Sequence, residues 1–284
     1  MDSWYSSPVH DPFAFVDDDG AETGALLVHG FTGSPYDVRP LGEAFHEIGI
    51  DAHGMMLPGM ARDIMRLNDM TGEIWRDAVN EAWDQVRSRY DRAVLLGYSL
   101  GGALATLAAV ERPPDLLVLI APLTRIPVRA ASLLPIGKYV IKDVNIYGKV
   151  DWSDERVHEW YRKVRPDIDT RDPETQRLFR EEAAFSTRML DEMRALLVDV
   201  RRAAPRVTVP TFVVQGTEDR VVLPRYTRQQ VMKLGGQVVY REMPGDHYLP
   251  LQWMPSWPYL KVAVQDELRA WLEAGDRQQA ALQR

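Results

Sequence analysis

Five short apolar runs constrain the fold of this chain more than any other feature. They cover residues 25–28, 93–96, 116–120, 211–214 and 237–240, and each ends at a loop rich in glycine, proline or charge. Segments with apolar residues at helical spacing separate them. Strands that are apolar at nearly every position are buried on both faces, as in a parallel sheet covered by helices. The sequence therefore predicts an α/β fold with a doubly wound, mostly parallel sheet.

A long insertion interrupts this alternation. About 90 residues separate the third run from the fourth, whereas one crossover helix needs only about a dozen. We therefore predict a core of residues 1–121 and 205–284, and a largely helical cap of residues 122–204. Its first part is rich in aromatic residues, including Trp152 and Trp160, which predicts a lid over an apolar pocket that binds substrate. The alternative is ordinary packing, because aromatics at helical spacing are more often core.

Two further segments are expected to form helices that connect to the sheet or pack on it. Residues 171–182 are strongly charged and predict a solvated helix that returns the chain to the sheet. Near the C-terminus, residues 259–273 carry Leu260, Val264 and Leu268 on one stripe, which predicts a helix docked on the sheet.

Composition excludes several classes of function. The net charge of -7 among 284 residues offers no basic field for nucleic acid or an anionic membrane surface. The absence of cysteine excludes disulfides and thiolate metal sites. No signal-peptide pattern opens the chain and no apolar run approaches the ~20 residues of a membrane span, so we expect a cytoplasmic protein without stable membrane insertion. No cofactor and no metal are expected, and a homodimer is left open.

The strongest chemical motif is Gly97-Tyr98-Ser99-Leu100-Gly101-Gly102, which lies between an apolar run and an alanine-rich segment. The order of strand, sharp turn and helix is the context in which G-x-S-x-G marks a nucleophile. A serine held at a strained turn forces its neighbours together, so Gly97 and Gly101 must lack side chains. This predicts Ser99 as the nucleophile.

The loop at residues 29–35 predicts an oxyanion site. In this fold one donor is the N–H after the nucleophile, here Leu100, and the other comes from the loop after the third strand, which this segment fits. We assign the second donor to the Phe31 N–H, and the Phe31 side chain to a wall of the substrate pocket. His29, in the same loop, is expected to be structural rather than catalytic.

The base and the acid are expected to follow Ser99 in the chain. His247 is the histidine that comes after the last apolar run, as the order serine, acid, histidine requires. Asp219, Glu218 and Asp246 compete to orient it. Asp219 follows a strand at the carboxyl end of the sheet, and its short side chain suits a fixed buried partner, so it is preferred.

Taken together, the segments 29–35 and 97–102, with Gly216-Thr217-Glu218-Asp219 and Gly245-Asp246-His247, resemble the bacterial carboxylesterase and monoacylglycerol lipase group of α/β-hydrolases. The resemblance implies hydrolysis of small carboxylic esters or monoacylglycerols without a cofactor. It also implies Ser99, Asp219 and His247 as triad, with Phe31 and Leu100 as oxyanion donors. The chain departs from the group at Leu57-Pro58-Gly59-Met60, which lacks a histidine, in its longer insert, and at residues 253–258.

The function predicted from the sequence is therefore a serine esterase that acts on a small-molecule ester through an acyl-enzyme on Ser99. The same residues would also serve hydrolysis of a carbon–carbon bond, lactone or thioester, or acyl transfer, because the pocket decides the reaction. A non-catalytic ligand receptor and a structural interaction protein are the remaining classes. An intact serine, histidine and acid argue against both.

Overall fold

The computed structural model describes residues 7–17, 20–126, 129–145, 147–148, 150–165, 168–181 and 183–282. Side chains are described for all of these except residues 129–130 and 278–282. Residues 1–6, to which the signal-peptide expectation refers, lie outside the described part.

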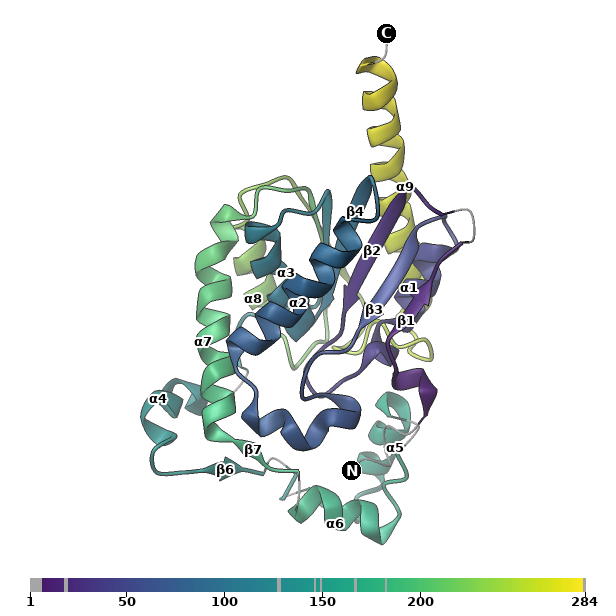
Figure 1. Ribbon diagram of the computed structural model, residues 1–284. Helices are drawn as coiled ribbons and strands as arrows, with labels where there is room; N and C mark the ends of the chain where they lie inside the picture. Colours follow the sequence, from purple (N-terminus) through teal and green to yellow (C-terminus); the bar gives the residue numbers. More distant parts are fainter. Residues whose placement is uncertain are drawn as a thin grey trace.

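A seven-stranded sheet forms the centre of the protein, in the order β1-β3-β2-β4-β5-β8-β9 (Figure 1). All neighbouring strands are parallel except β1, which pairs antiparallel with β3 at the edge. The strands are β1 (Phe13–Phe15), β2 (Thr23–Val28), β3 (Asp51–Met55), β4 (Arg92–Tyr98), β5 (Leu116–Ile120), β8 (Thr211–Gly216) and β9 (Val238–Met243). The predicted doubly wound, mostly parallel sheet is confirmed.

Four of the five predicted runs lie wholly in strands of this sheet, and the fifth does so from Val238 onward, but β1 and β3 were not predicted. Both are short, and β3 contains Asp51, His53 and Gly54, so it lacks the continuous apolar character used to recognise the others. The loop at residues 29–35 follows β2, which is the second strand of this chain and not the third.

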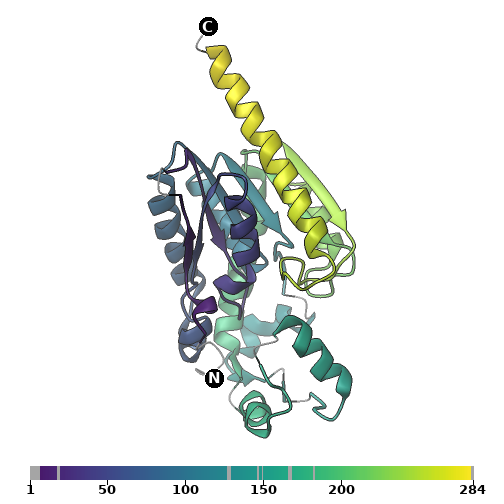
Figure 2. The same cartoon turned by 90° about the vertical axis from the view of Figure 1, so that its right-hand side faces the viewer.

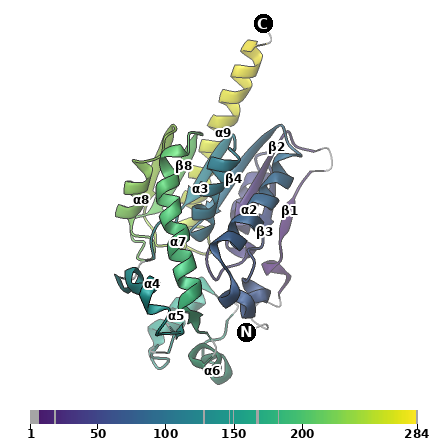
Figure 3. The same cartoon turned by 60° about the vertical axis from the view of Figure 1, so that its left-hand side comes forward.

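Helices cover both faces of the sheet. They are α1 (Arg39–His46), α2 (Gly72–Arg87), α3 (Leu100–Glu111), α7 (Thr187–Ala203), α8 (Pro224–Val231) and α9 (Trp257–Leu282). Helices α1 and α9 pack on one face, and α2, α3 and α7 on the other, where Figure 3 shows them with α8 in front of the strands. Alternate residues of β4, such as Val94 and Leu95, enter opposite cores, which explains why the predicted runs are apolar throughout.

The predicted C-terminal helix exists and is longer than expected. Leu260, Val264 and Leu268 are fully buried against the sheet, as the stripe predicted. Helix α9 continues to Leu282, and Figure 2 shows its last turns projecting beyond the sheet.

The segment between β5 and β8 holds most of the remaining elements. These are α4 (Leu134–Gly137), β6 (Asp143–Val144), α5 (Glu155–Val164), α6 (Pro173–Glu181), β7 (Phe185–Ser186) and α7. The 3₁₀ helices of the chain are η2 (Pro8–His10), η3 (Pro35–Asp37), η4 (Ala61–Asp69), η5 (Arg129–Leu133) and η6 (Ala204–Arg206). In Figure 1, α5 and α6 lie at the end of the molecule opposite the projecting end of α9.

Two parts of this segment differ in their packing. Trp152, Tyr161, Ile168 and Phe179 form a small apolar cluster of their own. Helix α7, by contrast, packs in the same core cluster as α3. The charged helix expected at residues 171–182 is α6, on which only Thr175 and Phe179 are buried. The boundary of the cap at residue 204 stays a prediction.

Candidate active site

Ser99 lies at a sharp turn between β4 and α3. Its backbone has φ 53° and ψ -115°, a conformation that costs free energy for any residue with a side chain. A Cβ on Gly97 would lie 2.3 Å from the Gly101 carbonyl oxygen, and one on Gly101 would lie 2.1 Å from that of Val28. Both glycines are therefore required by the close approach of the backbone, as the sequence indicated.

A chain of hydrogen bonds joins Ser99 to His247 and Asp219. The Ser99 hydroxyl donates to Nε2 of His247 at 3.0 Å, and Nδ1 of His247 donates to Oδ2 of Asp219 at 2.8 Å. The three residues come from the ends of β4, β8 and β9, which meet at the carboxyl edge of the sheet. All three are buried, so water competes little for these bonds.

Asp219 is held by donors on both carboxylate oxygens. Oδ1 accepts from the N–H groups of Val221 (2.8 Å) and Val222 (2.7 Å). Oδ2 accepts from Gln215 Nε2 at 3.0 Å as well as from His247. This arrangement fixes the carboxylate and leaves one oxygen directed at the imidazole.

The other two carboxylates do not reach His247. Glu218 is exposed, and Oδ1 of Asp246 accepts from the N–H of Tyr248 at 2.9 Å. The preference for Asp219 over its two neighbours therefore agrees with the hydrogen bonds of the described residues.

Sequence reasoning missed two residues that support this arrangement. Gln215 is fully buried, donates to Asp219, and accepts from the Thr227 hydroxyl at 2.6 Å. Tyr98 donates its hydroxyl to the backbone carbonyl of His247 at 2.9 Å. Burial raises the pKa of Tyr98 well above its usual value, so it stays a neutral donor. The sequence did contain a signal for Gln215, which is a polar residue near the end of the otherwise apolar strand β8.

The loop at residues 29–35 lies against Ser99. A Cβ on Gly30 would be 3.1 Å from the Ser99 Cβ, so the backbone of this loop passes directly beside Ser99. Within the described part of the chain, the N–H groups of Phe31 and Leu100 donate to no other group. Leu100 also begins α3, whose positive dipole end favours negative charge.

His29 serves this loop and does not contact Ser99. Its Nδ1 donates to the Gly30 carbonyl at 2.8 Å, and its Nε2 accepts from the N–H of Leu57 at 3.1 Å. The side chain therefore ties the loop beside Ser99 to the loop after β3. Burial lowers the pKa of His29 from 6.5 to about 4, which keeps the imidazole neutral.

This lowered pKa should make stability depend on pH. Between pH 6.5 and about 4, His29 binds a proton in the unfolded state but stays neutral in the folded state. The free energy of unfolding should therefore fall as the pH drops through this window, by about 3 kcal/mol in total. Urea unfolding of the wild type and His29→Gln at a series of pH values measures this. The variant should have a lower starting stability but a flatter pH dependence, and equal slopes would contradict the expectation.

The three residues expected to bind substrate occupy different surroundings. Phe31 is half-buried, with its ring 5.5 Å from that of Phe185. Trp160 is 42% exposed, and its ring lies 5.6 Å from that of Tyr248, beside His247. Trp152 is only 5% exposed and lies inside the small apolar cluster of the insert.

The insert therefore contacts the core on both sides of Ser99. One contact joins Phe185 of β7 to Phe31 beside Ser99, and the other joins Trp160 of α5 to Tyr248 beside His247. Trp160 also lines an open pocket of the insert with Tyr147, Val150, Val157 and Tyr161. This position makes Trp160 and Phe31 stronger candidates for substrate contact than Trp152.

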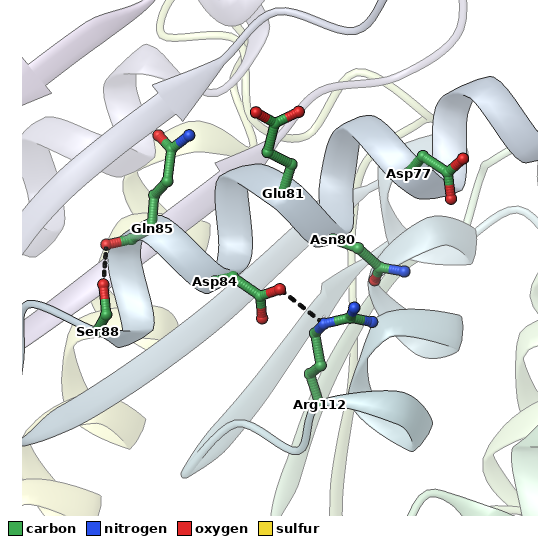
Figure 4. Close-up of a pocket in the computed structure, with 7 residues that line it drawn as sticks. All are labelled: Asp77, Asn80, Glu81, Asp84, Gln85, Ser88 and Arg112. Carbon is green, nitrogen blue, oxygen red and sulfur yellow. Dashed lines mark hydrogen bonds and ion pairs between the residues drawn. The ribbon is translucent and has the colours of Figure 1, made fainter.

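A second pocket lies on α2 and has a different character (Figure 4). Its lining is polar and includes Asp77, Glu81 and Asp84, the last paired with Arg112 at 2.9 Å. Arg112 follows the C-terminal end of α3, whereas Ser99 precedes its N-terminal end. Roughly 18 Å of helix separates them, so this pocket is remote from the serine.

A group with possible metal ligands also lies away from Ser99. Asp17, His46 and Asp51 bring their ligand atoms within 4.8 Å of one another. Asp51 begins β3, so the group is at the amino edge of the sheet, opposite the edge that carries Ser99. Nε2 of His46 lies 3.5 Å from Oδ1 of Asp17.

Chelation is therefore expected to leave ester hydrolysis unchanged. Ester hydrolysis by Ser99 and His247 needs only these two side chains, Asp219 and backbone donors, and none of these is a ligand of the group at the amino edge. Initial rates after incubation with EDTA and desalting test this. A loss of activity that only a divalent ion restores would contradict the expectation.

The sheet, together with a hydrogen-bonded serine, histidine and aspartate at its carboxyl edge, defines the class of the α/β-hydrolases. The chain belongs to the family described as serine aminopeptidase, S33, which matches residues 22–245.

Curated relatives of this chain are named as ester hydrolases. It is 27% identical over 203 residues to a thermostable monoacylglycerol lipase of Bacillus sp. (strain H-257), which covers 71% of this chain and 72% of that protein. It is 26% identical over 212 residues to a carboxylesterase of Bacillus subtilis (strain 168), covering 74% and 76%.

Solved structures share the fold across nearly the whole chain. A structure from the metagenome-derived lipolytic enzymes LipS and LipT superposes with a TM-score of 0.74 at 20% identity, covering 93% of this chain and 98% of that one. The monoacylglycerol lipase of Paleococcus ferrophilus superposes with a TM-score of 0.66 at 16% identity, covering 92% and 98%.

Proposed function

We propose that this protein is a serine esterase that hydrolyses carboxylic esters of small to medium acyl chains, including monoacylglycerols, through an acyl-enzyme on Ser99. The observation that carries the proposal is the hydrogen-bonded chain from Ser99 through His247 to Asp219. The names of the two Bacillus relatives support an ester as the substrate.

In the first half of the reaction, Ser99 attacks the ester carbonyl carbon. His247 Nε2 takes the hydroxyl proton, because Nδ1 keeps its own proton on Asp219. The carbonyl oxygen becomes an oxyanion that accepts from the free N–H groups of Phe31 and Leu100. Collapse of this intermediate breaks the bond to the alcohol, which leaves with the proton from Nε2.

In the second half, water replaces the alcohol. Nε2 of His247 removes a proton from water, whose oxygen attacks the acyl carbon, and the same N–H groups stabilise the second oxyanion. The acid is released when Ser99 recovers the proton. Each step uses residues at the carboxyl edge of the sheet, and none requires a cofactor.

A panel of substrates tests this proposal. Initial rates would be measured on p-nitrophenyl esters of graded chain length, monoacylglycerols, a thioester, a lactone and an aminoacyl p-nitroanilide. We expect the highest kcat/KM on carboxylic esters. A preference for the thioester, the lactone or the anilide would instead assign the same residues to another reaction, since fold and triad alone do not separate these chemistries.

The insert is proposed to set the preference among esters. Trp160→Ala should lower kcat/KM severalfold for long acyl esters and leave acetate esters nearly unchanged, because each methylene in contact contributes about 0.8 kcal/mol. Trp271→Ala, an aromatic truncation on α9, is the matched control. Equal losses on all esters would mean that Trp160 only supports the structure.

Trp152→Ala separates packing from substrate contact. Since Trp152 is buried within the insert, its truncation should lower the melting temperature rather than change the chain-length preference. The cytoplasmic location and the lack of nucleic-acid binding stay predictions, which cell fractionation and binding assays test directly. The homodimer that the sequence left open is tested by light scattering.

A further inference from the structure

Three arginines gather beside α7 and α8, at the edge of the sheet that carries the active site. Arg125 follows β5, Arg201 lies in the last turn of α7, and Arg225 lies in the first turn of α8. The N–H of Leu123, two residues before Arg125, donates to the Ser99 carbonyl at 2.9 Å. Figure 3 shows α7 and α8 side by side. We call Arg125, Arg201 and Arg225 the arginine cluster.

Direct contacts place the three side chains close together. The Cζ atoms of Arg125 and Arg225 each lie 4.9 Å from the centre of the Tyr226 ring. Nη1 of Arg201 donates at 2.5 Å to the carbonyl of Thr124, the residue before Arg125. Two guanidinium groups therefore share one aromatic ring, and the third binds the backbone beside one of them.

No carboxylate pairs with the arginine cluster among the described residues. The ion pairs of the same helices use other arginines: Arg194 with Asp191, Arg202 with Asp199, and Arg228 with Glu242. Burial lowers the pKa of Arg201, and the neighbouring cations Arg125, Arg194 and Arg202 lower it further. The charges that act on Arg201 are therefore of its own sign.

The charge of this region stays positive when every acidic residue is counted. The three segments that carry the cluster are residues 121–126, 191–203 and 217–228. They contain seven arginines, no lysine and five acidic residues, one of which is the Asp219 that binds His247. Their ion-pair partners from elsewhere, Lys138 and Glu242, cancel each other. The local net charge is therefore +2, whereas the whole chain has -7.

The first turn of α8 adds to this positive charge. It contains Arg225 and no acidic residue, and Leu223 before it provides no side-chain cap. The amino end of a helix carries partial positive charge, so a basic residue there is unfavourable for folding. Helix capping explains Arg201, which also donates to the Leu197 carbonyl of its own helix at 2.7 Å, but it does not explain Arg225. Cations held together in this way favour an anion between them.

We propose that the arginine cluster binds a phosphate group of a small molecule beside the active site. A guanidinium group stays charged at physiological pH and donates to phosphate oxygens in a bidentate way. Among the described residues, Nε and Nη2 of Arg201 donate to no other group. Arg125 and Arg225 are exposed, and Nη2 of Arg225 also donates to the Tyr226 hydroxyl at 3.2 Å.

The charge of the cluster indicates the class of ligand. A phosphate monoester carries a charge of about -1.5 to -2 at pH 7, which suits the local charge better than the single charge of a carboxylate. A long polyanion is disfavoured, because the rest of the chain is acidic. The phosphate belongs either to the alcohol part of an ester substrate or to a free phosphate compound that binds next to the site. Two measurements separate these sources.

Isothermal titration with pyrophosphate measures binding directly. We expect the wild type to bind pyrophosphate, and the double variant Arg125→Gln, Arg225→Gln to bind it roughly tenfold more weakly, because charge-assisted hydrogen bonds are strong. The matched control is Arg87→Gln with Arg206→Gln, which removes the same charge from two exposed positions without an ion pair among the described residues. This control should bind like the wild type.

Matched substrates test whether the phosphate belongs to the substrate. Hydroxyhexyl butyrate and its phosphate monoester differ only in the charged group at the far end of the alcohol. This measurement rests on the proposed esterase function, whereas the titration does not. If the substrate carries the phosphate, wild-type kcat/KM should be roughly tenfold higher for the phosphorylated ester. The double variant should lose this preference, and the ratio of the two substrates cancels any general loss of activity.

The outcomes are distinct. Weaker pyrophosphate binding by the double variant, without a wild-type preference for the phosphorylated ester, would assign the cluster to a free phosphate compound. A wild type that does not bind pyrophosphate, or a double variant that binds it equally well, would overturn the proposal. A wild type that hydrolyses neither ester would overturn the esterase function, and the titration would still decide on the phosphate site.

Discussion

Replacing Ser99 with alanine is expected to lower kcat for ester hydrolysis by roughly 10⁴ to 10⁶. The change removes the hydroxyl that donates to His247 and leaves the oxyanion donors in place. Alanine keeps a Cβ at the same strained turn, so the fold should be retained, with an unchanged melting temperature and circular dichroism spectrum. Initial rates with a p-nitrophenyl ester measure the loss.

Covalent labelling locates the nucleophile independently of turnover. A fluorophosphonate should modify the wild type at Ser99, as mapped by mass spectrometry, and should not modify Ser99→Ala. Ser88→Ala, at the end of α2, is the matched control and should label and turn over like the wild type. A Ser99→Ala enzyme with more than about a tenth of wild-type kcat would refute the assignment, because triad losses are far larger.

Replacing Asp219 with asparagine is expected to lower kcat by about 10⁴ through the tautomer of His247. The two N–H groups of Val221 and Val222 require an acceptor, so the amide oxygen should take the place of Oδ1. The amide NH₂ then faces Nδ1 of His247 and donates to it. The imidazole must carry its proton on Nε2, where it can no longer accept from Ser99.

The control for this variant is Glu218→Gln, which removes one negative charge from the adjacent exposed position. It should keep kcat within about twofold of the wild type, because exposed charges are screened by water. Fluorophosphonate labelling of Asp219→Asn should be slow but should still occur at Ser99, which separates this loss from unfolding. If the two variants behave alike, Asp219 does not orient the base.

Much of the candidate site could be predicted from residue order because local rules determine it. The turn at Ser99 needs Gly97 because a Cβ there would meet Gly101, and it needs Gly101 because the backbone of Val28 passes beside it. Strand β4 is recognisable since both its faces are buried. His247 and Asp219 then follow from the order of elements in the fold, and the structure places both within hydrogen-bond distance of the expected partner.

Other features could not be predicted because they depend on contacts between distant segments. Gln215 donates to Asp219 across the turn after β8, but it is held in that orientation by the Thr227 hydroxyl of α8, which the sequence does not reveal. Trp152 and Trp160 look alike in sequence, yet the fold of the insert buries the first and leaves the second beside Tyr248.

The sequence by itself determined the parallel sheet, the strained serine turn and the order of serine, acid and histidine, because burial on both faces and backbone crowding leave few residue choices. Only the tertiary structure decided how His29 ties two loops together, which aromatic side chains face the site, and which apolar residues of the insert stay exposed. The physical reason is that burial is a property of packing. The same tryptophan or isoleucine enters a core or faces solvent according to what the rest of the chain places against it.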